Sequence, residues 1–169
     1  IVAEADESDA SFLLLNPLIA VLTNIDVDHM ETYAGDFEKL KQSFVEFFKR
    51  LPFYGVAVVC IDDDNVRSIV PELRTRVVTY GLSEDADIRG FDFKQNGATS
   101  NFKIAIGVGS EPWPVKLNMP GEHNMLNALA AVAVAHELNI RNDVTANALG
   151  SFEGIGRRCQ ALGETSFGT

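Results

Sequence analysis

Apolar runs and amphipathic stretches alternate along the first half of the chain. Residues 18–22 form an unbroken apolar run with the profile of a β-strand that is buried on both faces. Apolar residues then recur at helical spacing over residues 36–50, and another apolar run follows at residues 56–61. A helix at residues 65–73 and a strand at residues 77–81 complete the series. This β-α-β-α-β order predicts a parallel sheet with right-handed crossovers.

The pattern changes in the second half. Short stretches with alternating polar and apolar residues occupy residues 87–93, 101–106 and 115–118, and turn-forming residues separate them. They predict a small antiparallel sheet attached to the parallel one. Two helices follow, the long one with its body at residues 128–138 and the other at residues 143–152. The predicted fold class is therefore α/β, with three layers in which helices flank a mostly parallel sheet that carries a small antiparallel sub-sheet.

Composition narrows the possible functions. A length of 169 residues suits one domain, and the formal net charge of −10 argues against a nucleic-acid-binding surface. No apolar run is long enough to span a bilayer, so we expect no membrane association. Two cysteines far apart in the sequence, Cys60 and Cys159, indicate neither a disulfide framework nor a zinc site. A reducing cytoplasm is the simplest location.

Both ends of the sequence look cut. The chain opens on Ile1 without an initiator methionine and stops at Thr169, shortly after a glycine-rich turn. We therefore expect residues 1–169 to be a fragment of a longer protein.

An acidic segment near the start contains the first candidate ligand. Residues 1–3 predict a short strand, and four carboxylates follow within six residues. Ser8 or Asp9 could cap a short helix, which would explain those two residues but not Glu4, which still lies in the strand pattern. Because a carboxylate at the end of a buried strand is costly unless it is paired or metal-bound, a metal-binding role for Glu4 stays open beside a purely structural one.

The stretch after the strand at residues 18–22 is the most suggestive one. Residues 23–30 read TNIDVDHM and include Asn24 and His29. The carboxyl edge of a parallel sheet is where open α/β folds bind ligands, so these side chains are candidates for a binding site. The alternative is a solvated loop in which Asp and Asn merely form turns. The three aspartates at residues 62–64 most simply cap the next helix.

The start of the long helix carries a pair of amides. Residues 120–127 read PGEHNMLN, which places Asn124 and Asn127 on one face of the first helical turn. Capping can use one of these amides but hardly both, whereas paired amides can read a purine edge. His123 is either a polar residue at a helix start or a catalytic residue. Arg158 follows a glycine turn, where a phosphate clamp and a solvated surface role are equally plausible.

These segments together resemble the central ATP-binding domain of the Mur ligase family, the amide ligases that build the peptidoglycan stem peptide. The resemblance covers essentially the whole chain and rests on four segments: EADESDASF at residues 4–12, TNIDVDHM at 23–30, PGEHNMLN at 120–127 and GRR at 156–158. The motifs are most similar to those of the branch that adds L-alanine to UDP-N-acetylmuramate. The branch that recycles murein tripeptide also begins EADE, but it usually carries Tyr where this chain has Ser8.

The resemblance implies a reaction in two stages. A substrate carboxylate attacks the γ-phosphate of ATP to give an acyl phosphate, and the amine of L-alanine then displaces phosphate. The implied catalytic residues are Glu4 and His29, as ligands of Mg²⁺ ions that neutralise the phosphates. Asn24 is implied as a weaker substrate contact.

The resemblance also implies a nucleotide site. Asn124 and Asn127 would bind adenine with His123 beside them, and Arg158 would contact the phosphate end of ATP. The family's glycine-rich phosphate loop, G-x-x-x-x-G-K-[ST], has no match in the chain, and we expect it just upstream of Ile1. We expect the family's carboxy-terminal domain, which binds the incoming amino acid, beyond Thr169. The chain alone, as the central domain at residues 1–169, should then be inactive. A non-catalytic binding module that kept the nucleotide-domain fold is the alternative.

The family's modified lysine cannot be placed. Several sister ligases carry a carbamylated lysine after the histidine motif, but Lys39 and Lys41 do not match its spacing well. We therefore carry no such role over to either residue.

Overall fold

One six-stranded sheet runs through the whole domain. The computed structural model describes residues 1–28 and 30–154. The strands are β1 (Ile19–Leu22), β2 (Val56–Cys60), β3 (Arg76–Gly81), β4 (Ile88–Asn96), β5 (Thr99–Ile106) and β6 (Trp113–Leu117). Their spatial order follows the sequence, with parallel pairing from β1 to β4 and antiparallel pairing from β4 to β6.

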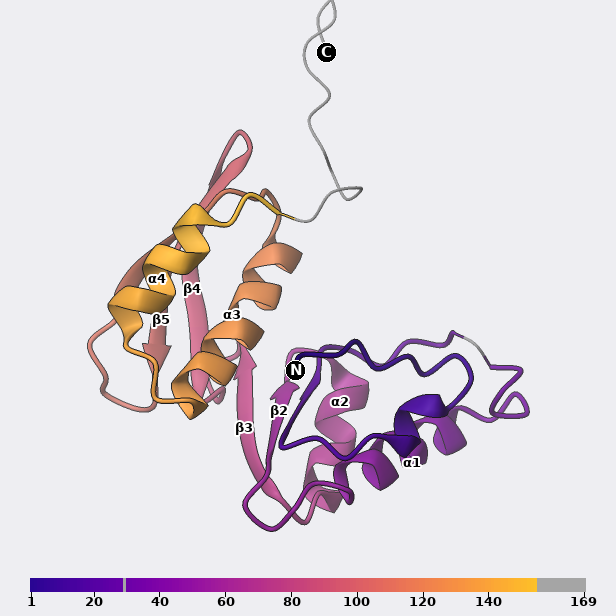
Figure 1. Ribbon diagram of the computed structural model, residues 1–169. Helices are drawn as coiled ribbons and strands as arrows, with labels where there is room; N and C mark the ends of the chain where they lie inside the picture. The colour runs from indigo at the N-terminus through magenta and orange to yellow at the C-terminus, as the bar shows by residue number, and fades with distance from the viewer. Residues whose placement is uncertain (29, 155–169) are drawn as a thin grey trace, which may run out of the picture.

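Helices cover both faces of this sheet (Figure 1). They are α1 (Phe37–Phe48), α2 (Asp64–Ile69), α3 (Glu122–Glu137) and α4 (Asn142–Ser151), with short 3₁₀ turns η1 (Ser11–Leu14) and η2 (Val70–Glu72). The helices α1 and α2 pack on one face and α3 packs on the other, so the predicted three-layer α/β fold is confirmed. None of the described helices is both long and apolar enough to cross a membrane.

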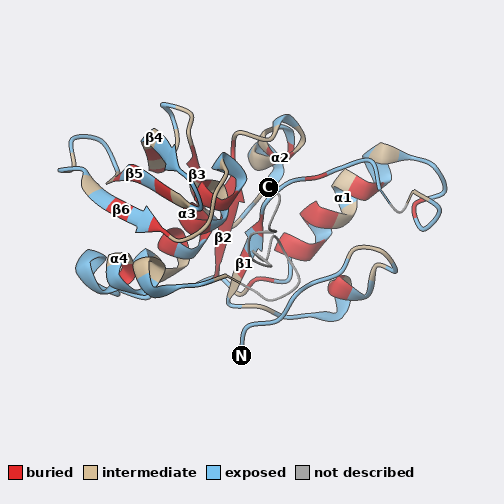
Figure 2. Cartoon of the chain, turned by 90° about the horizontal axis from the view of Figure 1, so that it is seen from above, coloured by how far each residue is buried: buried red, intermediate tan, exposed pale blue. Residues whose placement is uncertain are grey.

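The central strand β2 shows why two cores form. Its side chains alternate between the two faces, with Ala57 and Val59 toward α1 and α2, and Val58 and Cys60 toward α3. All five residues of β2 are buried, as the unbroken apolar run predicts. The burial colours of Figure 2 show the same buried band between the layers.

Two predictions about the amino-terminal part were wrong. Residues 1–3 form no strand, and Ile1 and Val2 are fully exposed. The strand β1 is buried on one face only, with Val21 42% exposed. Val21 lies beside Val58 on the face that α3 covers, but α3 packs mainly on β2, β3 and β4, so this face of the edge strand β1 stays exposed.

The predicted capping of the first short helix was also wrong in detail. The turn η1 starts after Ala10, which adopts a left-handed conformation (φ 60°), and no side chain caps it. The Asp9 carboxylate instead accepts a hydrogen bond from the Ser11 backbone N–H at 2.8 Å, which is a local turn. By contrast, Asp36 caps α1 by accepting hydrogen bonds from two backbone N–H groups.

A narrow seam joins the parallel and antiparallel halves of the sheet. The predicted small antiparallel sheet is continuous with the parallel one, but β3 and β4 pair through only two residue pairs, Tyr80 with Ile88 and Gly81 with Arg89. The helix α3 packs across this seam, on β2, β3 and β4. Its close approach requires Gly90, because a Cβ atom there would lie 2.3 Å from the Cε atom of Met125.

The first aspartate after β2 has a structural role. The Asp62 carboxylate accepts hydrogen bonds from the backbone N–H groups of Leu82 and Ser83, at 2.6 and 3.0 Å, and from the Ser83 hydroxyl at 2.6 Å. The next residue, Asp63, caps α2 by accepting a hydrogen bond from the Val66 N–H at 2.7 Å. Asp62 therefore ties the end of β2 to the end of β3, while Asp63 does the capping that the sequence predicts for this group.

Candidate functional site

A polar cavity of about 220 Å³ lies at the carboxyl end of β1. Two segments far apart in the sequence line its polar side. Ala5 and Glu7 come from the acidic amino-terminal segment, whereas Asn24, Asp26 and Asp28 come from the loop after β1. Aromatic rings of α1 close its apolar side. The structure thus brings the two candidate segments together at the edge of the sheet where ligand binding is expected.

Hydrogen bonds hold the loop after β1 in place. The Asn24 side chain accepts a hydrogen bond from the Thr23 hydroxyl at 2.9 Å and donates one to the Asp26 carboxylate at 2.6 Å. The Asn65 amide of α2 donates to the carbonyl oxygen of Ile25 at 2.9 Å. Asn24, the predicted substrate contact, therefore lines the cavity with an amide that its neighbours orient.

The acidic segment is attached to the same loop. The Tyr33 hydroxyl donates to the carbonyl oxygen of Glu7 at 2.7 Å, and the Thr32 hydroxyl donates to the carbonyl oxygen of Ser8. Burial raises the pKa of the Tyr33 phenol, and the neighbouring carboxylates, Glu7 first, raise it further. Phe12 anchors the other end of the segment against two aromatic rings of α1, at centroid distances of 5.3 and 5.2 Å.

Glu4 lies in an extended, exposed part of the acidic segment. The reasoning that a strand end makes this carboxylate costly does not hold, since no strand forms there. Among residues 1–28 and 30–154, no three His, Cys, Asp or Glu side chains are grouped to hold a metal ion. Magnesium commonly uses only one or two protein carboxylates and takes its other ligands from water and phosphate. The exposed Glu4 carboxylate can supply one such ligand, but Glu4 is not among the residues that line the cavity.

Two of the predicted site residues cannot be placed. His29 and Arg158 lie outside the described residues. Their predicted roles, as a magnesium ligand and as a phosphate contact, remain predictions.

The second predicted site is at the start of α3. Asn124 is 7% exposed, and its side-chain amide donates a hydrogen bond to the Pro120 carbonyl oxygen at 2.7 Å. Asn127 and His123 are exposed. The turn before the helix passes through Gly121, whose φ of 92° favours glycine. One amide is thus held locally, while the other is available to a ligand, so local hydrogen bonding accounts for only one of the pair.

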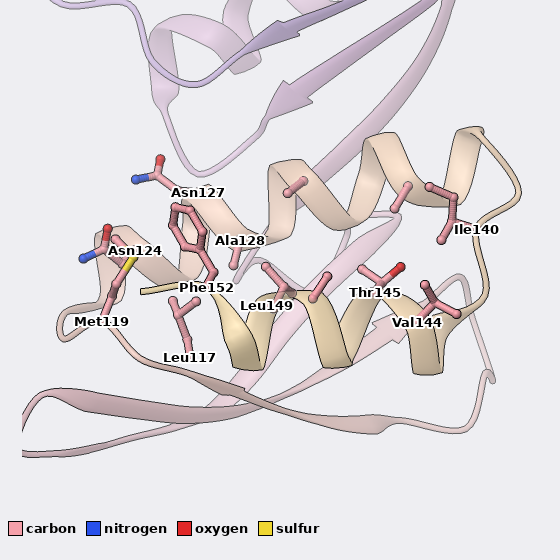
Figure 3. Close-up of a pocket in the computed structure, with 13 residues that line it drawn as sticks. Leu117, Met119, Asn124, Asn127, Ala128, Ile140, Val144, Thr145, Leu149 and Phe152 are labelled. Carbon is pink, nitrogen blue, oxygen red and sulfur yellow. The ribbon is translucent and has the colours of Figure 1, made fainter. Parts of the chain in front are cut away.

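Sequence reasoning missed an apolar cavity of about 440 Å³ between α3 and α4. Figure 3 shows Asn124, Asn127 and Phe152 at one end of this cavity and Ile140 and Val144 at the other. Small side chains leave the space open, because alanines recur along the side of α3 that faces α4. That repeat of alanines at helical spacing is the signal in the sequence that could have found the cavity.

These features define a class of protein. A polar cavity at the carboxyl edge of a parallel sheet, with amides beside a second cavity at a helix start, is typical of an α/β ligand-binding domain. The sequence matches the middle domain of the Mur ligases over residues 2–135. The chain therefore belongs to the Mur ligase family, as a middle domain of these ligases.

Solved structures support the fold. UDP-N-acetylmuramate–alanine ligase MurC from Thermotoga maritima is 23% identical, with a TM-score of 0.81 over 96% of this chain and 35% of that one. The UDP-N-acetylmuramate:L-alanyl-γ-D-glutamyl-meso-diaminopimelate ligase from Neisseria meningitidis is 25% identical, with a TM-score of 0.77 over 91% of this chain and 48% of that one. MurF ligase from Thermotoga maritima, solved in complex with ADP, is 24% identical, with a TM-score of 0.68 over 82% of this chain and 31% of that one. The chain spans 31% to 48% of the length of these three relatives.

Proposed function

We propose that this chain is the central ATP-binding domain of a ligase that adds L-alanine to UDP-N-acetylmuramate in the cytoplasm. The observation that carries the proposal is the meeting of the acidic segment with the loop after β1 around a polar cavity at the carboxyl end of β1. The motifs in these two segments are those most similar to the L-alanine-adding branch. An ADP complex of one similar ligase supports a nucleotide as the ligand.

The proposed reaction needs few reactive side chains. The lactyl carboxylate of UDP-N-acetylmuramate attacks the γ-phosphate of ATP, ADP leaves, and the amine of L-alanine then attacks the acyl phosphate and releases phosphate. Catalysis of such steps consists mainly of positioning and of neutralising charge. Bound Mg²⁺ would neutralise the phosphates, and Glu4 and His29 would hold it. Asn24 would contact the sugar substrate from the wall of the cavity.

The nucleotide would bind at the start of α3. Asn127 is exposed there, and the buried Asn124 lines the same cavity with its amide held by the Pro120 carbonyl oxygen. We propose that these two amides bind the adenine ring with His123 beside them, and that Arg158 contacts the phosphates. The chain by itself would then bind ATP weakly and catalyse no ligation.

The test uses the complete protein. Phosphate release is measured with ATP, Mg²⁺ and UDP-N-acetylmuramate, with L-alanine as the amine, and the ligated product is identified by mass spectrometry. We expect Glu4→Ala and His29→Ala to lower kcat by at least about a hundredfold with little change in thermal stability, because charge neutralisation is a large part of catalysis. Glu111→Ala and His136→Ala replace exposed residues of the same types elsewhere and should leave kcat unchanged. Near-normal turnover of either site variant at saturating Mg²⁺ would contradict its role.

A second candidate is the recycling of murein tripeptide. It is favoured by the 25% identity to the Neisseria meningitidis ligase and by the shared opening EADE at residues 4–7. The same assay with L-alanyl-γ-D-glutamyl-meso-diaminopimelate in place of L-alanine separates the two. Turnover with the tripeptide alone would identify the recycling reaction. If the protein binds nucleotide but turns over neither amine, the non-catalytic binding module is the correct description.

A further inference from the structure

A β-bulge in β4 changes which side chains face α3. Phe91 pairs with Lys103, but the next aligned pair is Lys94 with Asn101, so β4 has one extra residue between them. Asp92 lies in this bulge with a φ of 55°. Before the bulge, Gly90 faces α3, and an unbroken strand would continue with even-numbered residues on that face.

The extra residue shifts this alternation by one position. Phe93 therefore packs into the core on the α3 side, although a regular strand would turn it to the opposite face. Gln95 falls on the same side as Phe93. The bulge thus places a polar side chain near the tip of the β4–β5 hairpin, at the end of the domain where α3 starts (Figure 1).

Gln95 and its partner across the hairpin both bind the turn before α3. Gln95 lies directly opposite Ser100 in the β4–β5 register. The Gln95 side-chain oxygen accepts a hydrogen bond from the Gly121 N–H at 3.0 Å. The Ser100 hydroxyl, which is fully buried, donates to the Met119 carbonyl oxygen at 2.8 Å. The side chains of Gln95 and Ser100, which are neighbours in the sheet, therefore bind Gly121 and Met119 in the same turn.

This turn determines where the candidate amides lie. No side chain of the turn itself caps α3, and Gly121 has no side chain that could restrict its backbone. The Asn124 amide is bound in turn to the Pro120 carbonyl oxygen, between the two residues that the hairpin holds. A shift of the turn would therefore displace Asn124 and, one turn along the same helix face, Asn127.

We propose that Gln95 and Ser100 are positioning residues for nucleotide binding, which the β4 bulge directs onto the turn that carries the two amides. This inference rests on the proposed nucleotide site at the start of α3. Neither residue contacts the nucleotide in this proposal. They reduce the conformational freedom of the turn before the ligand binds, so their loss weakens nucleotide affinity while the chemistry at the carboxyl end of β1 is unaffected.

The test compares variants of the complete protein. Gln95→Leu removes the acceptor and keeps the size of the side chain, and Gln95→Glu keeps an acceptor oxygen. The loss of one neutral hydrogen bond predicts that Gln95→Leu raises the Kd for ADP and the KM for ATP about fivefold, with kcat unchanged. Gln95→Glu should restore both values, and Ser100→Ala should behave like Gln95→Leu. Gln42→Leu is the matched control, because Gln42 is an exposed-surface donor to Glu72 on the far side of the sheet.

The binding site itself needs its own control. Asn127→Ala should raise the Kd for ADP, measured by titration calorimetry. If it does not, the proposed nucleotide site is wrong. If it does, but Gln95→Leu and Ser100→Ala leave the Kd unchanged, the positioning role is wrong. A fall in kcat together with equal changes in the KM of every substrate would also overturn it, because a general loss of structure would explain that result.

Discussion

Replacing Asp62, a half-buried polar side chain, by alanine should destabilise the domain strongly. The carboxylate accepts three hydrogen bonds, from two backbone N–H groups and one hydroxyl of residues 82 and 83, at 2.6 to 3.0 Å. A hydrogen bond to a charged group contributes about 1.5–3 kcal/mol, and the three share one acceptor and are not additive. We therefore expect the free energy of unfolding to fall by about 3–4 kcal/mol, a large part of the 5–15 kcal/mol typical of a domain.

Urea unfolding followed by circular dichroism measures this loss. Ser83→Ala removes one of the three donors and should cost about 1 kcal/mol. In the Asp62→Ala background the same change should cost almost nothing, because its partner is already gone. Asp64→Ala is the control: this exposed carboxylate in the first turn of α2 should contribute no more than about 0.5 kcal/mol. A loss below about 1 kcal/mol for Asp62→Ala, or additive effects in the double variant, would refute the assigned role.

Three further changes should affect stability in defined ways. Phe12→Ala removes a ring that is 2% exposed and should lower the free energy of unfolding by about 3–5 kcal/mol, so a loss near zero in urea would contradict its anchoring role. Gly90→Ala puts a Cβ atom against the buried side chains of Met125 and Leu129 and should cost about 1–3 kcal/mol, so an unchanged urea midpoint would contradict this packing. Burial raises the pKa of the Tyr80 phenol, so the folded state keeps a proton that the unfolded chain loses above about pH 10. The free energy of unfolding therefore keeps its full value below about pH 10 and falls by up to about 1.4 kcal/mol per pH unit above it. Tyr80→Phe should make this fall less steep when the urea midpoint is measured at increasing alkaline pH.

The sequence predicts the elements whose signals are local. The run at residues 56–61 became β2, and the helical spacing after Asp36 became α1 with Asp36 as its cap. The helix expected at residues 65–73 ends as α2 at Ile69 and continues as a 3₁₀ turn, because Pro71 has no N–H group for an α-helical hydrogen bond.

Features that depend on distant partners could not be predicted in this way. Whether β1 is an edge depends on which strands lie beside it, and an apolar run reads the same in either place. The role of Gln95 depends on one extra residue in β4, which shifts the alternation without changing the composition of the strand. The Tyr33 and Thr32 hydrogen bonds that attach the acidic segment to the loop after β1 leave no local signal in the sequence, so they required the structure.

The short pairing between β3 and β4 affects how the two candidate binding regions are placed relative to each other. The cavity after β1 belongs to the parallel half of the sheet, whereas the turn before α3 is hydrogen-bonded to the β4–β5 hairpin of the antiparallel half. With only two residue pairs along the joint, backbone hydrogen bonds fix the angle between the halves weakly. Hydrogen bonds between Thr79 and Asp87 and the side chains of α3 that rest on β2, β3 and β4 restrain it further. Exchanging one such side chain for a larger or smaller one alters the spacing of the two regions while leaving every residue in both of them intact.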